Sequence, residues 1–551
     1  MGTRHHKTLR INPLDNVAVA LEDLPSDFEI HLNSISVFTS EPIPAKHKVL
    51  LSDLPEGDQI IMYGTLVGRA KKFLKAGSKV TVENTLHDTK PYLTKTENMT
   101  WDPPDIDHYN GLTFSGHVRS DGKVGTRNYW LVMPLVFCEN RNIDVMKTSL
   151  LEPLGYLTRK SFSFDLSPLI EEFRNYGEID PDKVTLQPSE LHQAHRIFPN
   201  LNGIKFLTHY GGCGCTRQDA QMLCELLAGY IAHPNVGGAT VLSLGCQNAQ
   251  IPILQEALNR LSPKLDKPVF YLEQQQFSSE RTFLEACIKK TFFGCTLANR
   301  NERVATPLNK LVLGLECGGS DGFSGISANP ALGHCTDLLI ALGGSAILSE
   351  FPELHGVEQE LMNRCADEII ANRFLKLMKA YELKAVHSGS GFAFNPSPGN
   401  IRNGLITDAM KSAGAALKGG TSPIKGVLDY GEVQETSGLN LLCTPGNDVE
   451  STTGLAGAGA NMIVFTTGLG TPTGNPIVPV IKVSSNTELS VRMRDIIDFN
   501  AGSIIEGSST IEEDGKELFE LLIEVASAIK STATENLGQD DFIPWKRGIS
   551  L

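Results

Sequence analysis

Short stretches in which apolar and polar residues alternate fill the first part of the chain. They cover residues 16–21, 47–51, 59–62 and 78–82, and turns rich in Pro, Gly and Asp separate them. Successive side chains of a strand point to opposite faces, so this alternation predicts strands with one buried face. The pattern therefore predicts a small β domain over residues 1–88.

A polar segment with two consecutive prolines follows this domain. Pro103 and Pro104 cannot lie inside a helix, because proline lacks the backbone N–H and its ring clashes with the preceding turn. Residues 89–112 are therefore expected to form a linker.

From residue 113 onward, apolar and β-branched runs alternate with amphipathic stretches. The runs at 203–210 and 239–244, for example, alternate with helical patterns at 218–231 and 252–261. This alternation is typical of a parallel sheet covered by helices, so the fold class is predicted to be α/β. We expect a central domain and a C-terminal domain, over residues 113–385 and 386–551. Further strands are expected at 310–315, 345–349, 461–466 and 479–483, and long helices at 357–383 and 514–531.

Three of the predicted strands run directly into loops that are rich in glycine and cysteine. These loops cover residues 209–215, 245–248 and 316–321. Ligands of open α/β sheets bind beyond the carboxyl ends of the strands, where glycine lets the backbone approach closely and helix N-termini favour anions. The three loops are therefore expected to converge on one pocket.

The charge balance and the absence of long apolar runs restrict the partners. The formal net charge is -14, which disfavours nucleic acid and anionic lipid as partners. No apolar run reaches the ~18–20 residues that span a bilayer, and residues 1–10 lack the apolar core of a secretory signal. We expect a cytoplasmic protein with a small-molecule substrate, no nucleic-acid partner and no membrane partner. A homo-oligomer stays open.

Several familiar catalytic motifs are missing from the sequence. The glycine clusters lack the spacing of a dinucleotide-binding loop, and the sequence contains no His-Glu-x-x-His helix. A Rossmann cofactor site and a metalloprotease site of the His-Glu-x-x-His type are therefore disfavoured.

The cysteines at the strand ends are candidates for metal ligands. The chain has eleven cysteines, and Cys213, Cys246 and Cys317 occupy equivalent strand ends, with His209 nearby. Thiolates and imidazole together suit a soft or borderline divalent metal. Tight turns with small buried side chains are the alternative. Four cysteines could also hold an iron–sulfur cluster, but the usual close spacings are absent, which favours a single ion.

Polar side chains elsewhere suit an acidic, hydroxylated ligand. The segment 320–330 packs hydroxyls, an amide and a carboxylate between glycines, which suits a polyhydroxylated ligand, although a plain surface loop would look similar. Arg127 precedes an apolar run and is the type of side chain that captures carboxylates, with a structural ion pair as the alternative.

Motifs along the whole chain resemble the altronate/galactarate dehydratase family. The segments 15–20, 43–49 and 63–70 are similar to the small β-clip (SAF-type) domain of that family. The large part resembles the family through the segments 116–122, 124–129, 317–321 and 465–468.

The resemblance implies the loss of water from a hexonic acid, altronate above all, to give a 2-keto-3-deoxy acid. It also implies a divalent metal, with Fe(II) favoured and Mn(II) or another divalent ion as alternatives. A proton next to a carboxylate is a very weak acid, so a cation must stabilise the enediolate while a base removes the proton. A second group must protonate the departing hydroxyl, and His is a common choice.

With this chemistry, each candidate residue receives a role. The acid/base candidates are His47, His209 and Tyr129, of which Tyr129 would hydrogen-bond the leaving group. The metal candidates are His47, Cys213, Cys246, Cys317 and Glu350. The substrate carboxylate would bind Arg127, Asn128 and Lys482, and its hydroxyls would bind Ser320, Asp321, Ser324 and Asn329.

Two residues depart from the pattern that we expect in relatives. Gln247 stands where we expect an acidic residue, and Glu316 precedes the Cys-Gly-Gly-Ser-Asp motif. A different substrate is one reading, so a lyase that acts on galactarate or sulfolactate is an alternative. A non-catalytic protein that binds metal or carbohydrate is the other alternative.

Overall fold

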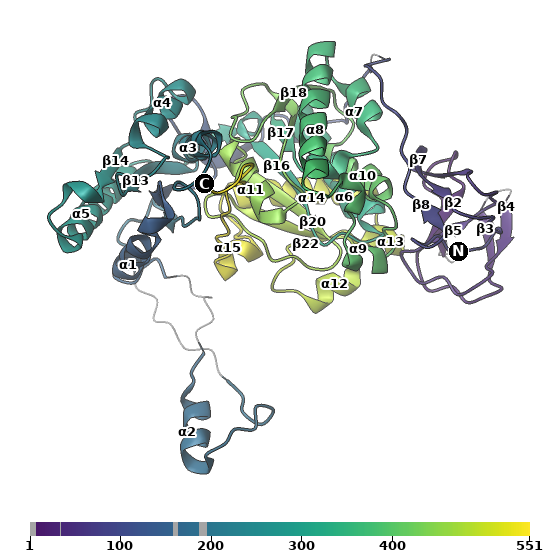
Figure 1. Ribbon diagram of the computed structural model, residues 1–551, viewed down its shortest axis with the longest axis horizontal. Helices are drawn as coiled ribbons and strands as arrows, with labels where there is room; N and C mark the ends of the chain where they lie inside the picture. The colour runs from purple at the N-terminus through teal and green to yellow at the C-terminus, as the bar shows by residue number, and fades with distance from the viewer. Residues whose placement is uncertain (1–6, 33–34, 98, 158–163, 187–194) are drawn as a thin grey trace.

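The computed structural model describes residues 7–32, 35–97, 99–157, 164–186 and 195–551. The chain forms a small β domain at one end, a large sheet in the middle and a second, smaller parallel sheet at the other end (Figure 1). The fold class predicted from the sequence is confirmed. Among the described residues, no helix is long and apolar enough to cross a membrane.

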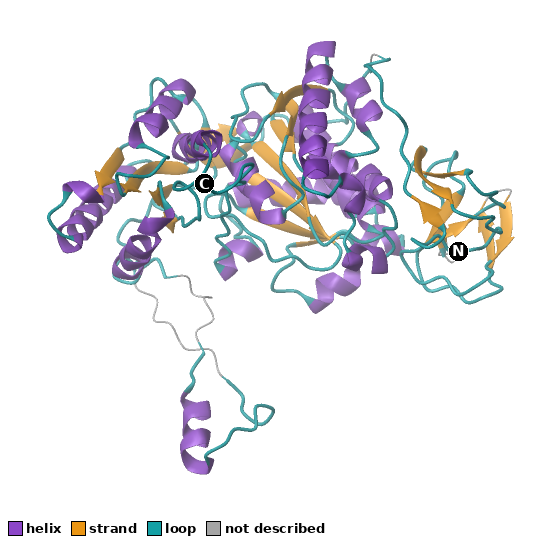
Figure 2. Cartoon of the chain, in the orientation of Figure 1, coloured by secondary structure: helices purple, strands orange, loops and turns teal. Residues whose placement is uncertain are grey.

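The small domain consists of short antiparallel strands in three sheets, ordered β1-β2-β5, β3-β4 and β6-β7-β8. Its described part is drawn as strands and loops alone, whereas helices surround the strands of the other two regions (Figure 2). The strands are β1 Thr8–Leu9, β2 Val17–Ala20, β3 Glu29–Leu32, β4 Ile35–Phe38, β5 Lys48–Leu50, β6 Gln59–Met62, β7 Thr65–Ala70 and β8 Thr85–Leu86.

The core of the small domain continues into the domain built around the seven-stranded sheet, which is called the C-terminal domain from here on. Val17, Leu50 and Ile60 belong to the same buried cluster as Phe323 and Met410. Apolar area is thus buried between the two domains as well as within them, which fixes how they sit against each other. The linker over 89–112 follows the surface of the C-terminal domain, where Lys95 Nζ donates hydrogen bonds to two of its backbone carbonyls.

A four-stranded parallel sheet forms the second region, in the order β12-β11-β13-β14. Its strands are β11 Tyr129–Pro134, β12 Gly203–Phe206, β13 Val236–Ser243 and β14 Val269–Glu273. Helices on its faces are α1 Asn140–Leu151, α3 Arg217–Ala232, α4 Ile251–Leu261 and α5 Glu280–Ala298, while α2 Ser167–Tyr176 lies apart from the sheets (Figure 1).

A seven-stranded parallel sheet forms the C-terminal region, in the order β18-β19-β17-β16-β20-β21-β22. Its strands are β16 Val312–Cys317, β17 Ser345–Leu348, β18 Ile424–Leu428, β19 Gly438–Leu442, β20 Met462–Thr467, β21 Val480–Ser484 and β22 Phe499–Asn500. Its α-helices are α6 Ala328–Ala341, α7 Glu358–Arg364, α8 Glu368–His387, α9 Pro398–Arg402, α10 Asp408–Ala416, α11 Asp448–Gly457, α12 Thr487–Arg492, α13 Gly502–Glu506, α14 Ile511–Ala526 and α15 Ala533–Leu537. A small antiparallel sheet joins β9 Thr113–Val118, β10 Val124–Gly125 and β15 Val304–Pro307.

The boundary between the two large domains does not fall between residues 385 and 386, where the sequence predicts it. That position lies inside α8, and the seven-stranded sheet takes strands from both sides of it, because β17 pairs with β19. Similar strand and helix patterns occur on both sides, so the sequence gives no sign of which strands share a sheet. The single helix expected at 357–383 is two helices, because Cys365 is extended and Asp367 caps α8.

The two parallel sheets pack together through α3 and α11, at a contact between two glycines. A Cβ at Gly229 would lie 2.4 Å from the carbonyl oxygen of Gly457. Only the absence of a side chain lets the two helices approach this closely. Leu226 and Phe465 belong to the buried cluster around this contact.

The variant Gly229→Ala tests this close approach. An added methyl group must push α3 and α11 apart, so we expect the free energy of unfolding to fall by about 1–3 kcal/mol. The helix preference of Ala over Gly acts in the opposite direction, by about 1 kcal/mol. Chemical denaturation measures the change. Gly399→Ala in α9 is the control, because a Cβ there meets nothing nearer than 3.7 Å. Equal stability of the two variants would contradict the packing.

Candidate active site

A group of buried ionisable side chains lies beyond the carboxyl ends of β16 and β17. We call it the charged cluster, and its contacts and mutual charge effects link residues from five segments of the C-terminal region. Parallel strands end at one edge of the sheet, which is the usual place for a ligand site in α/β folds. The members are Glu316, Cys317, Glu350, Glu353, Lys411, Lys418, Asp448 and Lys482.

Strand ends and helix starts position these side chains. Glu316 and Cys317 are the last two residues of β16, and Glu350 follows β17 in the left-handed backbone region, with φ 68°. A residue other than glycine is uncommon there and costs about 1–3 kcal/mol, so its surroundings must hold it. The backbone N–H of Glu350 donates to Thr444 Oγ1 at 2.8 Å, and its carboxylate accepts from the backbone N–H of Cys317.

Two lysines reach the cluster from one helical segment. Lys411 lies on α10 and Lys418 on the 3-10 turn Leu417–Gly419 that continues it. Residues two helical turns apart share a face, which aims both ammonium groups at the same place. Lys411 Nζ contacts Glu353 Oε1 at 2.6 Å, and Lys418 Nζ contacts Glu350 Oε2 at 2.7 Å.

Cys317 lies at the centre of these contacts. Its Sγ is 3.1 Å from Glu353 Oε2 and 3.4 Å from Glu350 Oε2. Lys418 Nζ donates a hydrogen bond to the same sulfur at 2.8 Å. Burial raises the pKa of the Cys317 thiol well above its usual range, and the charges of both glutamates raise it further. The thiol form can therefore donate to Glu353 while it accepts from Lys418.

The glutamates of the cluster differ in how readily they ionise. Burial raises the pKa of Glu316 well above its usual range, and the charge of Glu350 adds to the effect. Burial also disfavours the charged form of Glu353, but the ammonium groups of Lys411 and Lys418 outweigh it and lower its pKa. Glutamates with such different surroundings can serve different chemical roles in one site.

Asp448 and Lys482 form a second part of the cluster. Asn447 caps α11, so Asp448 is the first residue of that helix. Burial raises the pKa of Asp448 to about 7, helped by the charges of Glu350 and Glu353. Burial lowers the pKa of Lys482 to about 7. Both groups can thus change protonation near neutral pH, which is what general acid–base catalysis requires.

Lys482 has an unusual environment for an amine. Its side chain is fully buried, and its Nζ lies 3.3 Å from the centre of the Phe465 ring. Within the described part of the chain, this nitrogen has no hydrogen-bond partner. Burying an amine without a hydrogen-bond partner lowers the stability of the fold, so the presence of Lys482 here indicates a functional group.

The small domain reaches the same edge of the sheet. Lys46 Nζ is 2.9 Å from Asp321 Oδ2, and Lys48 Nζ donates to the Gly404 carbonyl at 2.7 Å. A Cβ at Gly322 would lie 2.2 Å from the Lys46 carbonyl oxygen, so this docking requires glycine. His47, between the two lysines, is half-buried, and burial lowers its pKa. Its loop therefore docks a few residues beyond Cys317.

The residues expected to bind substrate hydroxyls contact the protein itself. Asp321 accepts from the backbone and hydroxyl of Ser324, among others, and Asn329 donates to the Gly414 carbonyl and accepts from Thr466 Oγ1. The carbonyl of Ser320 accepts from Asn400. These contacts fix the loop that follows Cys317 and leave Asp321 fully buried.

Arg127, Asn128 and Tyr129 lie away from the charged cluster, next to α15. Arg127 makes a two-pronged ion pair with Glu535 at 2.6 and 2.9 Å, and Tyr129 donates to the same carboxylate. Asn128 accepts from Arg119 and donates to two backbone carbonyls. Of the three residues expected to bind the substrate carboxylate, the structure brings only Lys482 to the cluster.

His209 is held on both ring nitrogens by the backbone. Its Nε2 donates to the Pro134 carbonyl at 2.8 Å, and its Nδ1 accepts from the Gly211 N–H at 3.1 Å. Burial lowers its pKa to about 4, so the ring is neutral. His209, Cys213 and Cys246 belong to the four-stranded sheet, and both cysteines are exposed.

The expectation that three strand-end loops converge holds for two of them. The backbone N–H of Asn248 donates to the Gly212 carbonyl at 2.9 Å, which joins the loops 209–215 and 245–248. The loop 316–321 follows β16 of the other sheet. For this loop the expectation was wrong, because equivalent strand ends do not reveal which strands share a sheet.

Among the described residues, two groups of three side chains bring their ligand atoms close enough together to share one metal ion. Cys317, Glu350 and Glu353 form one, and His87, His355 and Asp408 form the other. In each group the ligand atoms all lie within 4.8 Å of one another. The first contains two of the predicted metal candidates.

The second group joins the end of the small domain to α10. His355 Nδ1 is 2.6 Å from Asp408 Oδ2, and His87 Nδ1 is 3.9 Å from Asp408 Oδ1. His87 and His355 stack, with ring centres 5.6 Å apart. No motif in the sequence indicates this group, because its members are far apart in the chain.

Other residues of the charged cluster were also missed. Glu353, Lys411, Lys418 and Asp448 were not among the predicted site residues, and they come from 3-10 and helical segments between the strands. The spacing of Glu350 and Glu353 beyond one strand end, and of the two lysines on one helix face, is the signal that could have found them.

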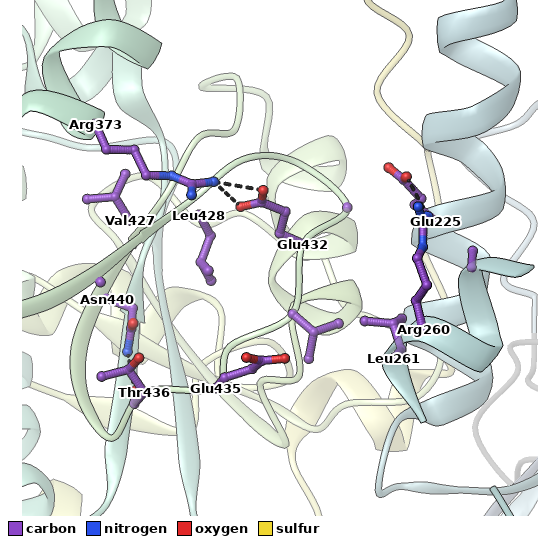
Figure 3. A pocket seen from close by; sticks show the side chains of 14 residues that line it. Glu225, Arg260, Leu261, Arg373, Val427, Leu428, Glu432, Glu435, Thr436 and Asn440 are labelled. Atoms are coloured by element: carbon purple, nitrogen blue, oxygen red, sulfur yellow. Dashed lines mark hydrogen bonds and ion pairs between the residues drawn. The ribbon is translucent and has the colours of Figure 1, made fainter. Parts of the chain in front are cut away.

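A surface groove elsewhere shows a different kind of lining. It has a volume of about 470 Å³ and lies between α4 and the loops around β18 (Figure 3). Its arginines are already paired, Arg373 with Glu432 and Arg260 with Glu225. An acidic substrate would have to displace these glutamates, so the charged cluster is the better candidate site.

Three family models match successive parts of the chain. The altronate/galactarate dehydratase SAF domain matches residues 6–88, and the second domain of D-galactarate dehydratase/altronate hydrolase matches residues 116–299. The C-terminal domain of D-galactarate/altronate dehydratase matches residues 308–550.

Characterised relatives match over almost the full length. An altronate dehydratase of Bacillus subtilis (strain 168) is 35% identical, over 94% of this chain and 95% of its own. An altronate dehydratase of Escherichia coli (strain K12) is 32% identical, over 98% and 99% of the two chains. A galactarate dehydratase (L-threo-forming) of Escherichia coli (strain K12) is 30% identical, over 96% and 94%. With the three domain matches in the same order, the chain belongs to the altronate/galactarate dehydratase family, a family of hydro-lyases.

Proposed function

We propose that the protein removes water from a hexonic sugar acid, with altronate favoured, to give a 2-keto-3-deoxy sugar acid. The observation that carries the proposal is the charged cluster, where Asp448 and Lys482 have pKa values near 7 beside Cys317. The two altronate dehydratases that match over nearly the whole chain support altronate as the substrate. We further propose that the enzyme acts in the cytoplasm.

The reaction needs a base, an acid and positive charge, and we assign them to the cluster. A neutral Lys482 amine would remove the proton next to the carboxylate, and a protonated Asp448 would donate a proton to the departing hydroxyl. Lys411 and Lys418 supply fixed positive charge for the enediolate in a buried site. His47, which the small domain carries to the neighbouring loop, is the second candidate for the acid.

We assign structural roles to several residues that the sequence suggested for catalysis or substrate binding. His209, Arg127 and Asn128 use their polar atoms on their own chain, and so does Tyr129. Asp321, Ser324 and Asn329 would act by holding the loop that follows Cys317. Ser320 keeps its proposed contact with a substrate hydroxyl, because it is a buried residue of that loop, three positions after Cys317.

A divalent metal ion, with Fe(II) favoured, belongs to the proposal. Cys317, Glu350 and Glu353 would hold it, and their surroundings fit a cation. Glu350 Oε1 and Glu316 Oε1 are buried oxygens that accept no hydrogen bond from a nitrogen or hydroxyl of the described chain, and only a protonated Glu316 carboxyl could donate to Glu350. When bound, such an ion supplies Lewis-acid stabilisation of negative charge on the substrate.

The group of His87, His355 and Asp408 is the alternative location for the ion. Two imidazoles and one carboxylate are a typical ligand set for Fe(II). His87 Nδ1 and Asp408 Oδ1 are buried without a hydrogen-bond partner in the described residues, which also fits a cation. The two locations differ in one respect that an experiment can use, since only the first has a thiol.

Replacement of Lys482 tests the assigned base. Assays of 2-keto acid formation from altronate, galactarate and sulfolactate should show the highest kcat/KM with altronate. Lys482→Met should lower kcat by about a hundredfold or more, as expected for loss of a general base. The variant should unfold at the same or a higher denaturant concentration, because it removes a buried amine without a partner.

The control is Glu432→Gln, which breaks an exposed ion pair in the groove and should leave kcat unchanged. Turnover of sulfolactate alone, or full activity of Lys482→Met, would contradict the proposal.

The pH dependence follows from the two groups near pH 7. Lys482 must be neutral to accept a proton, so kcat/KM should rise with pH through about 7. Asp448 must be protonated to donate, so kcat/KM should fall above about 7. The profile should be a narrow bell, and Asp448→Asn should remove its alkaline limb from the residual activity. A rate that is independent of pH between about 6 and 8 would rule out this pair.

Cobalt substitution locates the divalent metal. A chelator should abolish activity, and Co(II) added to the metal-free protein should show a thiolate-to-cobalt charge-transfer band in the near ultraviolet. Cys317→Ser should remove this band, whereas His355→Ala should keep it. A cobalt spectrum without the band in the unmodified protein, and loss of cobalt in His355→Ala, would assign the ion to the histidine group instead.

A further inference from the structure

The exposed cysteines of this chain are confined to one edge of the four-stranded sheet. Eleven cysteines are free, and Cys138, Cys213 and Cys246 alone are exposed. Cys138 follows β11, Cys213 follows β12 and Cys246 follows β13, which are three neighbouring strands in the order β12-β11-β13. Because these strands are parallel, their ends and the three cysteines lie at the same edge.

Backbone contacts join the three loops. The N–H of Phe137, next to Cys138, donates to the Gly211 carbonyl at 3.2 Å. The N–H of Asn248 donates to the Gly212 carbonyl at 2.9 Å. Gly212 has φ +92°, and a Cβ there would lie 2.0 Å from the Leu135 carbonyl oxygen, so the loop needs glycine to pass this close.

The thiols themselves act on one another. Burial raises the pKa of Cys138, and the negative charges of Cys213 and then Cys246 raise it further. The three sulfurs are not all within 4.8 Å of one another, because the two groups of ligand atoms that lie this close together contain none of these cysteines.

Helix N-termini surround this edge. The helices α1, α3 and α4 begin at Asn140, Arg217 and Ile251, shortly after Cys138, Cys213 and Cys246. The positive end of a helix dipole stabilises thiolates and bound anions. Three such ends at one edge favour a ligand that carries several thiolates and a net negative charge.

We propose that Cys138, Cys213 and Cys246 hold an iron–sulfur cluster at the edge of the four-stranded sheet. A single tetrahedral ion with bonds of about 2.3 Å to sulfur would bring the sulfurs to within about 4 Å of one another. An iron–sulfur cluster holds its thiolates farther apart, which agrees with three sulfurs that follow neighbouring strands and are not all within 4.8 Å of one another. The site is separate from the charged cluster and does not depend on the proposed reaction.

The cluster would keep one iron without a cysteine ligand. Cys215, the nearest further thiol in sequence, is buried, and the charge of Asp219 on α3 acts on it. Its backbone pairs with Ser550, which holds it away from the edge. A four-iron cluster on three cysteines therefore has one iron open to solvent, because all three cysteines are exposed.

Iron and acid-labile sulfide analysis of the full-length protein tests the proposal. The protein is purified without oxygen and reconstituted with ferrous iron, sulfide and a thiol reductant. We expect iron and sulfide in nearly equal amounts, with a broad visible absorption band. Oxidation by ferricyanide, which takes one electron from the cluster, should release Fe(II) from the open position. The three-iron form that remains is paramagnetic and visible by EPR.

Single substitutions assign the ligands. Cys138→Ser, Cys213→Ser and Cys246→Ser should each lower bound sulfide by about tenfold or more, since loss of even an outer-shell group commonly costs this much affinity. Cys215→Ala in the same loop is the matched control and should keep the cluster. Circular dichroism checks that the exposed-site variants are folded.

Three results would overturn the assignment. Bound metal without sulfide would mean a single ion, and an unchanged cluster in the three serine variants would mean other ligands. A cluster that ferricyanide does not convert to the three-iron form would mean a fourth protein ligand. Sulfide content reports on this site alone, because the divalent ion proposed at Cys317 carries none.

Discussion

Charge compensation inside the C-terminal region is the constraint on which the site depends. Lys418 is fully buried and contacts both Cys317 Sγ and Glu350 Oε2. Removing one partner from such a buried pair leaves an uncompensated charge, which commonly costs about 3–5 kcal/mol. The left-handed conformation of Glu350 is held by the same surroundings. Chemistry at this edge therefore has a fixed electrostatic frame, in which Asp448 and Lys482 have pKa values near neutral pH.

Docking of the small domain extends this frame. Lys46 brings positive charge to the loop after Cys317, where it pairs with the fully buried Asp321. Because the apolar cores of the two domains are continuous, this loop and the small domain form one packed unit. The small domain thus packs against the same strand ends that carry the charged cluster. A movement of His47 would also move Lys46, which pairs with Asp321.

Local patterns in the sequence were enough for the strands, for the small domain and for the strand ends as sites of chemistry. They could not show long-range partners. Arg127 looked like a carboxylate ligand, but Glu535 pairs with it from the far end of the chain. Lys411 and Lys418 stand on a helical segment without any motif, and only the fold brings them to Glu353 and Glu350. A polar residue at a strand end indicates that it lies at the edge of a sheet. Whether it binds a ligand depends on the side chain with which the fold pairs it.

The predicted grouping of Cys317 with Cys213 and Cys246 also fails because local patterns do not show which strands share a sheet. All three follow parallel strands, yet β16 belongs to one sheet and β12 and β13 to another. The two regions are nevertheless in contact, because residues 214 and 215 pair with Leu551 and Ser550 at the end of the C-terminal region. The loop that carries Cys213 is thereby tied to the domain that carries Cys317. Each sheet edge thus carries its own cysteines, and the C-terminal segment contacts the loop that carries Cys213.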